Sequence, residues 1–263
     1  MRFASLGSGS EGNALLVESV DGACTTRVLI DCGFGLRDVE RRLRAAGCEP
    51  AVLDAILVTH EHADHIGGVF RLARAHRIPV HLTHGTLRAA GALLPERFEA
   101  LDLLRLFDVH DPFDCAGLRI EPVAVPHDAR EPVQYVIDDG RRRLGVLTDL
   151  GQGTPHVVQA FSRLDALVLE CNHDAQMLAD NPRYPAMLKQ RIAGPWGHLD
   201  NLEAARILAA IDASRLRSVV AAHLSRHNNR PELARQALVS ADRVDPALIR
   251  VADQDRGIDW IAV

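Results

Sequence analysis

The hydrophobic positions in the first half of the chain form short runs separated by turn residues, followed by helical spacing. Three β-like runs bounded by Gly, Ser, Asp and Asn predict three strands in a meander. Residues 36–46 have apolar side chains at helical intervals and stop at Gly47, which predicts a helix, and a second helix is predicted over 66–75. The strands predicted in this half cover residues 3–6, 14–17, 28–30, 55–58 and 80–82.

The second half of the chain has the same order, with strands first and strand–helix alternation afterwards. Strands are predicted over residues 118–125, 133–137, 144–147, 166–169 and 218–222, and helices over 199–211 and 231–239. Two rounds of this order predict an α/β fold, an αββα sandwich of two packed mixed sheets with outer helices. No repeat, low-complexity segment or linker marks a boundary, so a single domain over residues 1–263 is expected.

Composition narrows the class of protein. A 263-residue chain with 47% hydrophobic residues can bury one large core. Its formal net charge of -5 is unlike that of proteins that hold long duplex DNA by charge alone, so any contact with nucleic acid must be local or rest on bound metal.

Five cysteines without a CxxC pair favour reduced thiols, and no apolar segment resembles a signal peptide or a membrane span. A cytoplasmic protein without membrane contact is therefore expected.

The strongest chemical signal is an HxHxDH motif directly after the apolar run at 55–58. His60 and His62 lie two apart in an extended segment, so their side chains point the same way and can bind one ion. Asp64 and His65 fall where the chain turns into a helix and can face a second ion. Neutral imidazole and carboxylate suit zinc, iron or manganese. The alternative is a solvated polar loop, but the preceding buried strand favours a metal site.

A strand, an HxHxDH motif and a helix in this order resemble the metallo-β-lactamase superfamily, which has an αββα fold. The resemblance implies three more ligands at the ends of later strands, and His127, Asp149 and His223 stand at such positions. His227 is an alternative to His223, which is preferred because it directly follows a strand. The implied arrangement has Asp149 as a bridge between one ion held by His60, His62 and His127 and another held by Asp64, His65 and His223.

Later segments indicate which branch of the superfamily the chain resembles. Glu170 ends a predicted strand, His198 follows a glycine at a helix start, and His223 is followed by Leu-Ser. This order resembles ribonuclease Z and, more loosely, the β-CASP nucleases, in which an acidic residue and a second-motif His act on the scissile phosphate. The β-CASP group inserts a large domain between the bridging Asp and that His. The interval between Asp149 and His198 is too short for such a domain.

Matches to a narrower type, the YycJ (WalJ) bacterial metallo-hydrolases, run nearly end to end. They cover residues 5–13, 30–33, 60–65, 126–129, 148–151, 170–174, 184–192, 197–201, 223–225 and 228–229. The type resembles a 5′-to-3′ DNA exonuclease, so the resemblance implies an enzyme that acts on DNA. Two positions depart from the expected pattern. Asp200 replaces a Ser at a helix cap, and Cys171 replaces a small residue and has no assigned role.

These observations predict a phosphodiesterase in which two divalent ions, Zn or Mn, share a hydroxide. The predicted catalytic residues are Asp64, which orients the nucleophile, and His198, which contacts the phosphate or protonates the leaving oxygen with support from Glu170. DNA ends are the expected substrate. The alternative is a small-molecule thioesterase or lactonase with the same metals, which the acidic net charge favours and the Glu170–His198 pair disfavours.

Three polar segments have two interpretations each. Residues 8–13, rich in Gly and Ser, form either a flexible hairpin turn or a loop whose amides approach a phosphate. The three arginines at 141–143 are more typical of a solvated β-turn than of a phosphate site. Arg226 and Arg230 flank the last predicted ligand, so they are better placed to meet a phosphate.

Overall fold

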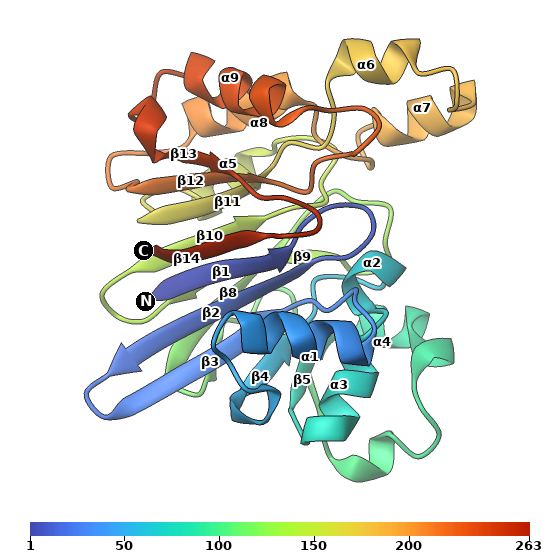
Figure 1. Cartoon of the computed structure of the whole chain (residues 1–263), viewed down its shortest axis with the longest axis vertical. Coiled ribbons are helices and arrows are strands. Elements are labelled where there is room, and N and C mark those ends of the chain that lie inside the picture. Colours follow the sequence, from blue (N-terminus) through green and yellow to red (C-terminus); the bar gives the residue numbers. More distant parts are fainter.

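A computed structural model describes all 263 residues of the chain. Two seven-stranded mixed sheets lie face to face (Figure 1). The first sheet contains, in spatial order, β14 (Ile258–Ala262), β1 (Arg2–Gly7), β2 (Ala14–Asp21), β3 (Cys24–Ile30), β4 (Ala55–Leu57), β5 (Val80–Thr83) and β6 (Leu104–Phe107). The second contains β13 (Ile249–Val251), β12 (Ser218–Ala222), β11 (Ala166–Glu170), β10 (Arg143–Leu147), β9 (Val133–Asp138), β8 (Leu118–Ala124) and β7 (Phe113–Cys115).

Helices flank the two sheets, which confirms the predicted αββα sandwich. Those of the first half are α1 (Leu36–Ala45), α2 (Ala63–Ile66), α3 (Val69–His76) and α4 (His84–Ala89). Those of the second half are α5 (Pro155–Ala160), α6 (Ala175–Asp180), α7 (Ala186–Ile192), α8 (Asn201–Ala210) and α9 (Pro231–Ser240). Short 3-10 helices are η1 (Pro50–Val52), η2 (Gly91–Leu93), η3 (Glu99–Leu101) and η4 (Pro246–Leu248). In Figure 1, α6 and α7 project at the upper right, beyond the sheets. None of the helices has both the length and the apolar character needed to cross a membrane.

Strands buried on both faces explain why the sequence shows continuous apolar runs. In β2, Leu15 and Val17 face the core between the two sheets, whereas Leu16 faces the core between the first sheet and its helices. When both faces of a sheet are covered, the sequence of each strand is a continuous apolar run and does not alternate between apolar and polar residues. Tyr135, fully buried in β9, donates a hydrogen bond to the carbonyl of Val58 at 2.6 Å and so joins the two sheets.

The topology brings several strand ends to one edge of the sandwich. Strands β3 to β6 are parallel to one another, as are β10 to β13. Ligand sites in α/β sheets lie outside the carboxyl ends of parallel strands. The HxHxDH motif follows β4, and the other predicted ligands follow β8, β10 and β12. The fold therefore gathers the candidate residues of both halves.

The helix predicted over 66–75 is two helices, α2 and α3, divided at Gly67 and Gly68. The amide of Gly68 donates to the carbonyl of Cys32 at 2.7 Å, and a Cβ on Gly68 would lie 1.9 Å from the carbonyl oxygen of Phe34. Only glycine permits this close approach. Four short edge strands, β6, β7, β13 and β14, and the helices α4 to α7 were not predicted from the sequence. Short segments of this kind have too few residues for a reliable period.

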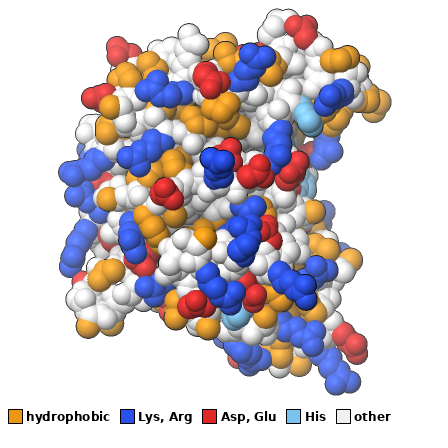
Figure 2. Space-filling model, in the orientation of Figure 1, with side chains coloured by type: hydrophobic (Ala, Val, Ile, Leu, Met, Phe, Trp, Pro, Cys, Tyr) orange, Lys and Arg blue, Asp and Glu red, His pale blue; other side chains and the backbone are white.

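The surface carries charges of both signs. On the face drawn in Figure 2, Lys and Arg side chains are interspersed with Asp and Glu, and no broad basic area is visible. The surface is indented on the right side of this view, between the level of α7 and the level of α2. The net charge of -5 agrees with this mixed surface.

Candidate metal centre

The deepest group of predicted ligands, called the mixed cluster, consists of Asp64, His65, Asp149 and His223. Asp64 Oδ2 lies 3.5 Å from Nε2 of both His65 and His223. Asp149 Oδ2 lies 3.1 Å from His65 Nε2. The side chains of His65, Asp149 and His223 are at most 2% exposed. Two imidazoles and two carboxylates therefore converge from α2 and from the ends of β10 and β12.

Two further buried carboxylates hold the imidazoles of the mixed cluster. Asp31, directly after β3, accepts a hydrogen bond from His65 Nδ1 at 2.8 Å. Glu170, the last residue of β11, accepts one from His223 Nδ1 at 3.1 Å. Because Nδ1 carries the proton toward the carboxylate, Nε2 of each ring faces the cluster, as a metal-binding histidine requires.

Charges inside the mixed cluster balance one another. Burial opposes charge on the imidazoles, but the carboxylates of Asp149 and Asp64 raise the pKa of His65 well above its usual value. They likewise raise the pKa of His223 to about 10. In return, and again against burial, imidazolium charge holds the pKa of Asp149 well below its usual range and lowers that of Glu170 to about 2. Protons on the imidazoles thus offset the buried carboxylates when no other cation is present.

Three residues that follow strands at this edge have a left-handed backbone. The φ angles of Asp31, Asp149 and His223 are 60°, 53° and 55°. This conformation costs a residue with a side chain about 1–2 kcal/mol. Hydrogen bonds support it, since Asp31 Oδ1 accepts from the amide of Thr59 and Ser8 Oγ accepts from the amide of His223, both at 2.8 Å. Backbone strain held in place by its surroundings is typical of functional sites.

The Gly-Ser loop at residues 8–13 supports the mixed cluster. Asn13 Oδ1 accepts from the amide of Gly9 at 2.8 Å, which fixes the side chain. Its Nδ2 lies 3.0 Å from His65 Nε2 and 3.4 Å from Asp64 Oδ2. The sequence left a hairpin turn and a phosphate loop as alternatives for this segment. In the structure its side chains contact the ligands themselves.

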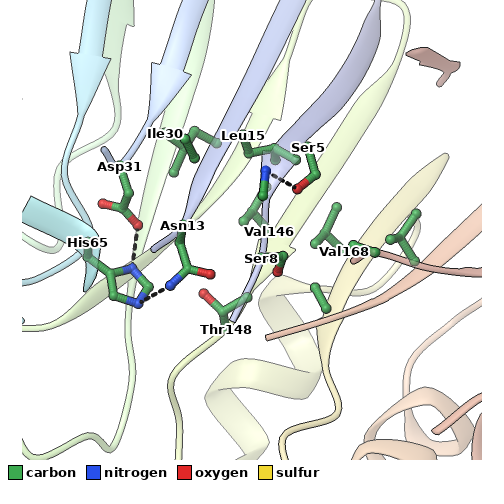
Figure 3. Close-up of a pocket in the computed structure, with 15 residues that line it drawn as sticks. Ser5, Ser8, Asn13, Leu15, Ile30, Asp31, His65, Val146, Thr148 and Val168 are labelled. Carbon is green, nitrogen blue, oxygen red and sulfur yellow. Dashed lines mark hydrogen bonds and ion pairs between the residues drawn. The ribbon is translucent and has the colours of Figure 1, made fainter. Parts of the chain in front are cut away.

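A cavity of about 30 Å³ lies between the sheets behind the mixed cluster (Figure 3). A buried water needs roughly 10–15 Å³ and a few polar partners, so this space suits one or two waters and no substrate. Its polar lining residues are Ser5, Ser8, Asn13, Asp31, His65 and Thr148.

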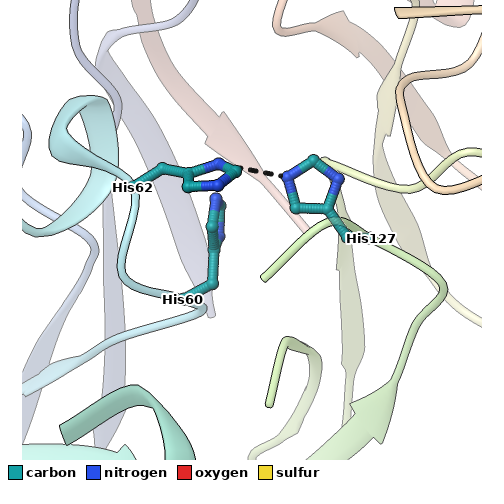
Figure 4. Close-up of side chains that lie close together, drawn as sticks. All are labelled: His60, His62 and His127. Atoms are coloured by element: carbon teal, nitrogen blue, oxygen red, sulfur yellow. Dashed lines mark hydrogen bonds between the residues drawn. The ribbon is translucent and has the colours of Figure 1, made fainter. Parts of the chain in front are cut away.

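The histidine cluster consists of His60, His62 and His127, whose rings lie close together in edge-to-face arrangements (Figure 4). Their ring centroids are 4.6 to 5.0 Å apart. His62 Nδ1 lies 3.3 Å from His127 Nε2. His60 Nε2 is buried and has no hydrogen-bond partner. The ligand nitrogens of the three rings thus lie within 4.8 Å of one another.

Neutral groups orient the histidine cluster. His127 Nδ1 donates to the carbonyl of Gly197 at 3.0 Å. Thr59 Oγ1 donates to Asp31 at 2.7 Å and so accepts from His60 Nδ1 at 3.0 Å. Burial lowers the pKa of both His60 and His127, which keeps these imidazoles neutral. Neutral imidazole is the form that binds a metal ion.

The residues present fit a divalent-metal centre. His60 Nε2 is fully buried and has no hydrogen-bond partner, which is costly for a polar atom unless another partner is present. The ligand atoms of His60, His65 and Asp149 lie within 4.8 Å of one another, so Asp149 faces both clusters. Imidazole nitrogen and carboxylate oxygen together suit zinc and manganese.

His198 lies between the two clusters and belongs to a turn, not to a strand end. Its ring centroid is 5.2 Å from that of His127 and 5.4 Å from that of His223. Glu170 holds Nδ1 at 2.8 Å, while Nε2 has no partner and the side chain is 23% exposed. Glu170 itself is fully buried and also accepts from the amides of Leu150 and Leu199. Glu170 is therefore placed to position His198, which alone of the pair reaches the surface.

Two candidates from the sequence lie outside the centre. His227, the alternative to His223, is exposed, and its ring lies 6.5 Å from that of Tyr184. Arg226, which was expected to be well placed for a phosphate, instead pairs with Asp255 at 2.6 Å and Glu11 at 3.3 Å. Two carboxylates, more than its single charge can offset, therefore face its guanidinium.

The remaining singled-out residues have structural roles. Asp200 caps α8 by accepting from the amide of Glu203 at 2.7 Å. Cys171 is fully buried, and burial raises the pKa of its thiol, so it is not a nucleophile. The arginines at 141–143 lie at the turn between β9 and β10 and pair with nearby carboxylates. This agrees with the β-turn interpretation.

Asp31, Ser8 and Asn13 were missed as site residues. Asp31 had a usable signal, because it follows a strand of the parallel series just as Asp149 does. Ser8 and Asn13 had none, since their contacts depend on a loop that packs against residues far away in the chain.

Sequence comparisons show which known proteins the chain is similar to. The Beta-lactamase superfamily domain matches residues 26–223. The chain is 34% identical over 238 residues to exodeoxyribonuclease YycJ from Bacillus anthracis, covering 90% of this chain and 88% of that protein. It is 30% identical over 264 residues to exodeoxyribonuclease WalJ from Streptococcus pneumoniae, covering 98% and 92%. Ribonuclease Z from Bradyrhizobium diazoefficiens is 27% identical over 92% of each chain.

Solved structures share the fold at low identity. The crystal structure of zinc-bound PqqB from Methylobacterium extorquens has a TM-score of 0.74 over all of both chains, at 17% identity. The metallo-beta-lactamase fold protein YhfI from Bacillus subtilis has a TM-score of 0.73 over 99% of both chains, also at 17% identity. Together with the close sequence relatives, these findings show that the chain belongs to the beta-lactamase superfamily, as a metal-dependent hydrolase of the group that includes YycJ and WalJ.

Proposed function

We propose that the chain is a dinuclear metal-dependent nuclease that shortens DNA from a 5′ end. The observation that carries the proposal is the pair of clusters that share Asp149, with the free Nε2 of His198 beside both. A buried cradle for two cations next to a partly exposed imidazole suits attack on a phosphodiester. The relatives named exodeoxyribonucleases, which cover nearly the whole chain, support DNA as the substrate.

Each residue near the clusters has a distinct task in this reaction. Divalent ions, Zn or Mn, would be held by the seven clustered ligands, and when bound they lower the pKa of water and offset charge on the phosphate. Asp64, whose carboxylate is 24% exposed, orients the attacking water. His198 donates a proton from Nε2 to the leaving oxygen, and Glu170 keeps it protonated by raising its pKa.

The acidic surface limits how the enzyme holds a polyanion. With a net charge of -5 the chain offers little long-range attraction, so contact should be confined to a few phosphates near the centre. The logarithm of affinity should then fall with that of salt concentration at a slope equivalent to about two to four contacts. Few contacts suit an enzyme that binds a strand end.

The decisive experiment compares substrates on one preparation of the metal-loaded enzyme. We expect linear 5′-labelled DNA to be shortened, circular single-stranded DNA to resist, and a nitrophenyl thioester to be inert. Equal cleavage of circles would exclude a pure exonuclease. Preference for RNA of the same sequence would favour a ribonuclease, in line with the similarity to ribonuclease Z. Fast thioester turnover with inert DNA would assign the chain to the small-molecule hydrolases.

A further inference from the structure

The turn between α7 and α8 is fixed rigidly against the metal centre. The amide of His198 donates to the carbonyl of Ile192 at 2.8 Å, and the amide of Gly197 donates to that of Gly194 at 2.9 Å. A Cβ on Gly197 would lie 2.2 Å from the carbonyl oxygens of Arg191 and Ile192, so the turn closes tightly at this glycine. The carbonyl of Gly197 in turn accepts from a ligand of the histidine cluster. The backbone of this turn is therefore held in place beside the centre.

Arg191, the second-last residue of α7 and so close to this turn in sequence, pairs with a carboxylate beside the histidine cluster. Its Nε donates to Asp128 Oδ2 at 2.5 Å. The other oxygen of Asp128 lies 3.6 Å from His127 Nε2 and 3.7 Å from His62 Nε2. The Arg191 side chain is 63% exposed, and its two terminal nitrogens bind no other group of the chain. These nitrogens can bind an anion beside the cluster, and a planar guanidinium suits phosphate.

Trp196, on the same turn, is an exposed aromatic residue without a partner. It is 61% exposed, and it stands two positions before His198. The chain's other tryptophan, Trp260, donates from Nε1 to the carbonyl of Ala46 and lies under the guanidinium of Arg2. Trp260 thus has the contacts expected of a structural tryptophan, and Trp196 has none. An exposed indole five residues after an arginine with free nitrogens matches the combination of aromatic and basic side chains that proteins use for single-stranded nucleic acid.

We propose that Arg191 and Trp196 form a subsite for the terminal nucleotide of the substrate. Trp196 stacks on its nucleobase, and Arg191 binds its phosphate, while Asp128 holds the guanidinium in place. The inference rests on the proposed nuclease function and deepens it. It also explains how an acidic protein engages a strand end, because stacking does not depend on net charge.

Fluorescence tests the stacking directly, without any turnover. A Trp260→Phe protein retains Trp196 as its only tryptophan, since the chain has two. With metal bound, a short single-stranded DNA with phosphorothioate linkages, which resists hydrolysis, should quench its emission. The same DNA with an abasic 5′-terminal nucleotide should quench it much less. Equal quenching by both strands, or quenching by neither while the DNA binds, would overturn the proposal.

Steady-state kinetics test how much stacking on Trp196 contributes to substrate binding. Trp196→Ala should raise KM for linear DNA by about 5- to 100-fold, the range for one stacked base, with kcat nearly unchanged. Trp196→Phe should restore most of this loss and Trp196→Leu little, because only a flat ring stacks. On the abasic strand Trp196→Ala should cost nothing. Equal losses on both strands would indicate a structural role and sink the proposal.

Arg191→Ala should also raise KM and should lower the salt dependence of binding by about one contact. The matched controls are Trp260→Phe and Leu93→Ala. Leu93 is an apolar residue of η2 whose side chain is 48% exposed. Both should leave KM unchanged. Failure of the wild type on every DNA would refute the proposed function, whereas wild-type activity with unaffected Trp196 and Arg191 variants would refute only the subsite.

Discussion

The two clusters of the metal centre use opposite electrostatics. The histidine cluster has three imidazoles, is oriented by a hydroxyl and a backbone carbonyl, and holds at least His60 and His127 neutral. The mixed cluster contains two carboxylates and is backed by two more, Asp31 and Glu170. The first is a set of imidazoles with one carboxylate, that of Asp128, beside it, and the second is a buried region of negative charge that needs cations.

Depth differs between the clusters as well. His62 of the histidine cluster is 29% exposed, whereas the imidazoles of the mixed cluster are at most 2% exposed. Asp128 and Arg191 stand on the exposed side. If the proposed function is correct, substrate should arrive at the more exposed histidine cluster, while the mixed cluster should supply the buried charge that holds a second cation. Mutations should therefore separate binding of metal, binding of substrate and proton transfer.

The largest effect is expected for Asp149, the one residue that faces both clusters. Asp149→Ala should remove both ions and lower activity by more than about 10⁴-fold, because metal-dependent acceleration is then lost. Elemental analysis of the purified protein measures the ions. His62→Ala is the matched variant and should lose chiefly one ion. A single ion in fully active wild-type protein, or full metal content in Asp149→Ala, would contradict a shared centre.

The next largest effect separates His198 from both clusters. His198→Ala should keep metal content near that of the wild type while kcat falls by about 10²–10⁴-fold, the range for a general acid. A readout specific to proton transfer is a substrate with a nitrophenolate leaving group, which needs no acid and should be cleaved by the variant at nearly the wild-type rate. If metal and activity are lost together, His198 is a ligand.

A smaller effect tests the carboxylates behind the mixed cluster. Asp31→Asn removes the charge that orients His65 but keeps the shape, so affinity for the ion of the mixed cluster should fall by about 10–100-fold. The histidine cluster should change less, since Asp31 reaches it only through Thr59. Competition with a chromophoric chelator measures the two affinities. Asp212→Asn, an exposed carboxylate far along the chain, is the control. An equal fall at both clusters would remove the distinction drawn between them.

The difference between a contiguous motif and residues dispersed along the chain explains what the sequence could predict. The HxHxDH motif is contiguous and follows a buried strand, so its four residues and the fold class were readable from local pattern. His127, Asp149 and His223 required the superfamily resemblance, because a lone His or Asp after a strand is common. Asp31 has the same local context as Asp149 and was missed, since only the tertiary structure shows that it holds His65. Ser8 reaches His223 across nearly the whole chain, and no local pattern encodes such a contact.

The smallest effect concerns protons released when metal binds. In the metal-free protein His65 and His223 are protonated at pH 7 because their pKa values are raised, that of His223 to about 10. His60 and His127 are neutral because their pKa values are lowered. An ion entering the mixed cluster must displace protons, whereas one entering the histidine cluster displaces none from these two rings.

The free energy of unfolding of the metal-free protein should also depend on the protonation of these histidines. A histidine with a raised folded pKa stabilises the metal-free fold fully below its unfolded pKa of about 6.5, and this contribution is lost as pH rises through about 10. The melting temperature of the metal-free protein should therefore fall across this window, while affinity for the ion of the mixed cluster rises. Calorimetric titration in two buffers with different ionisation enthalpies gives the protons released per ion. We expect about one to two for the mixed cluster and close to none for the histidine cluster. Equal release at both would show that the two clusters do not differ in charge as their hydrogen bonds indicate.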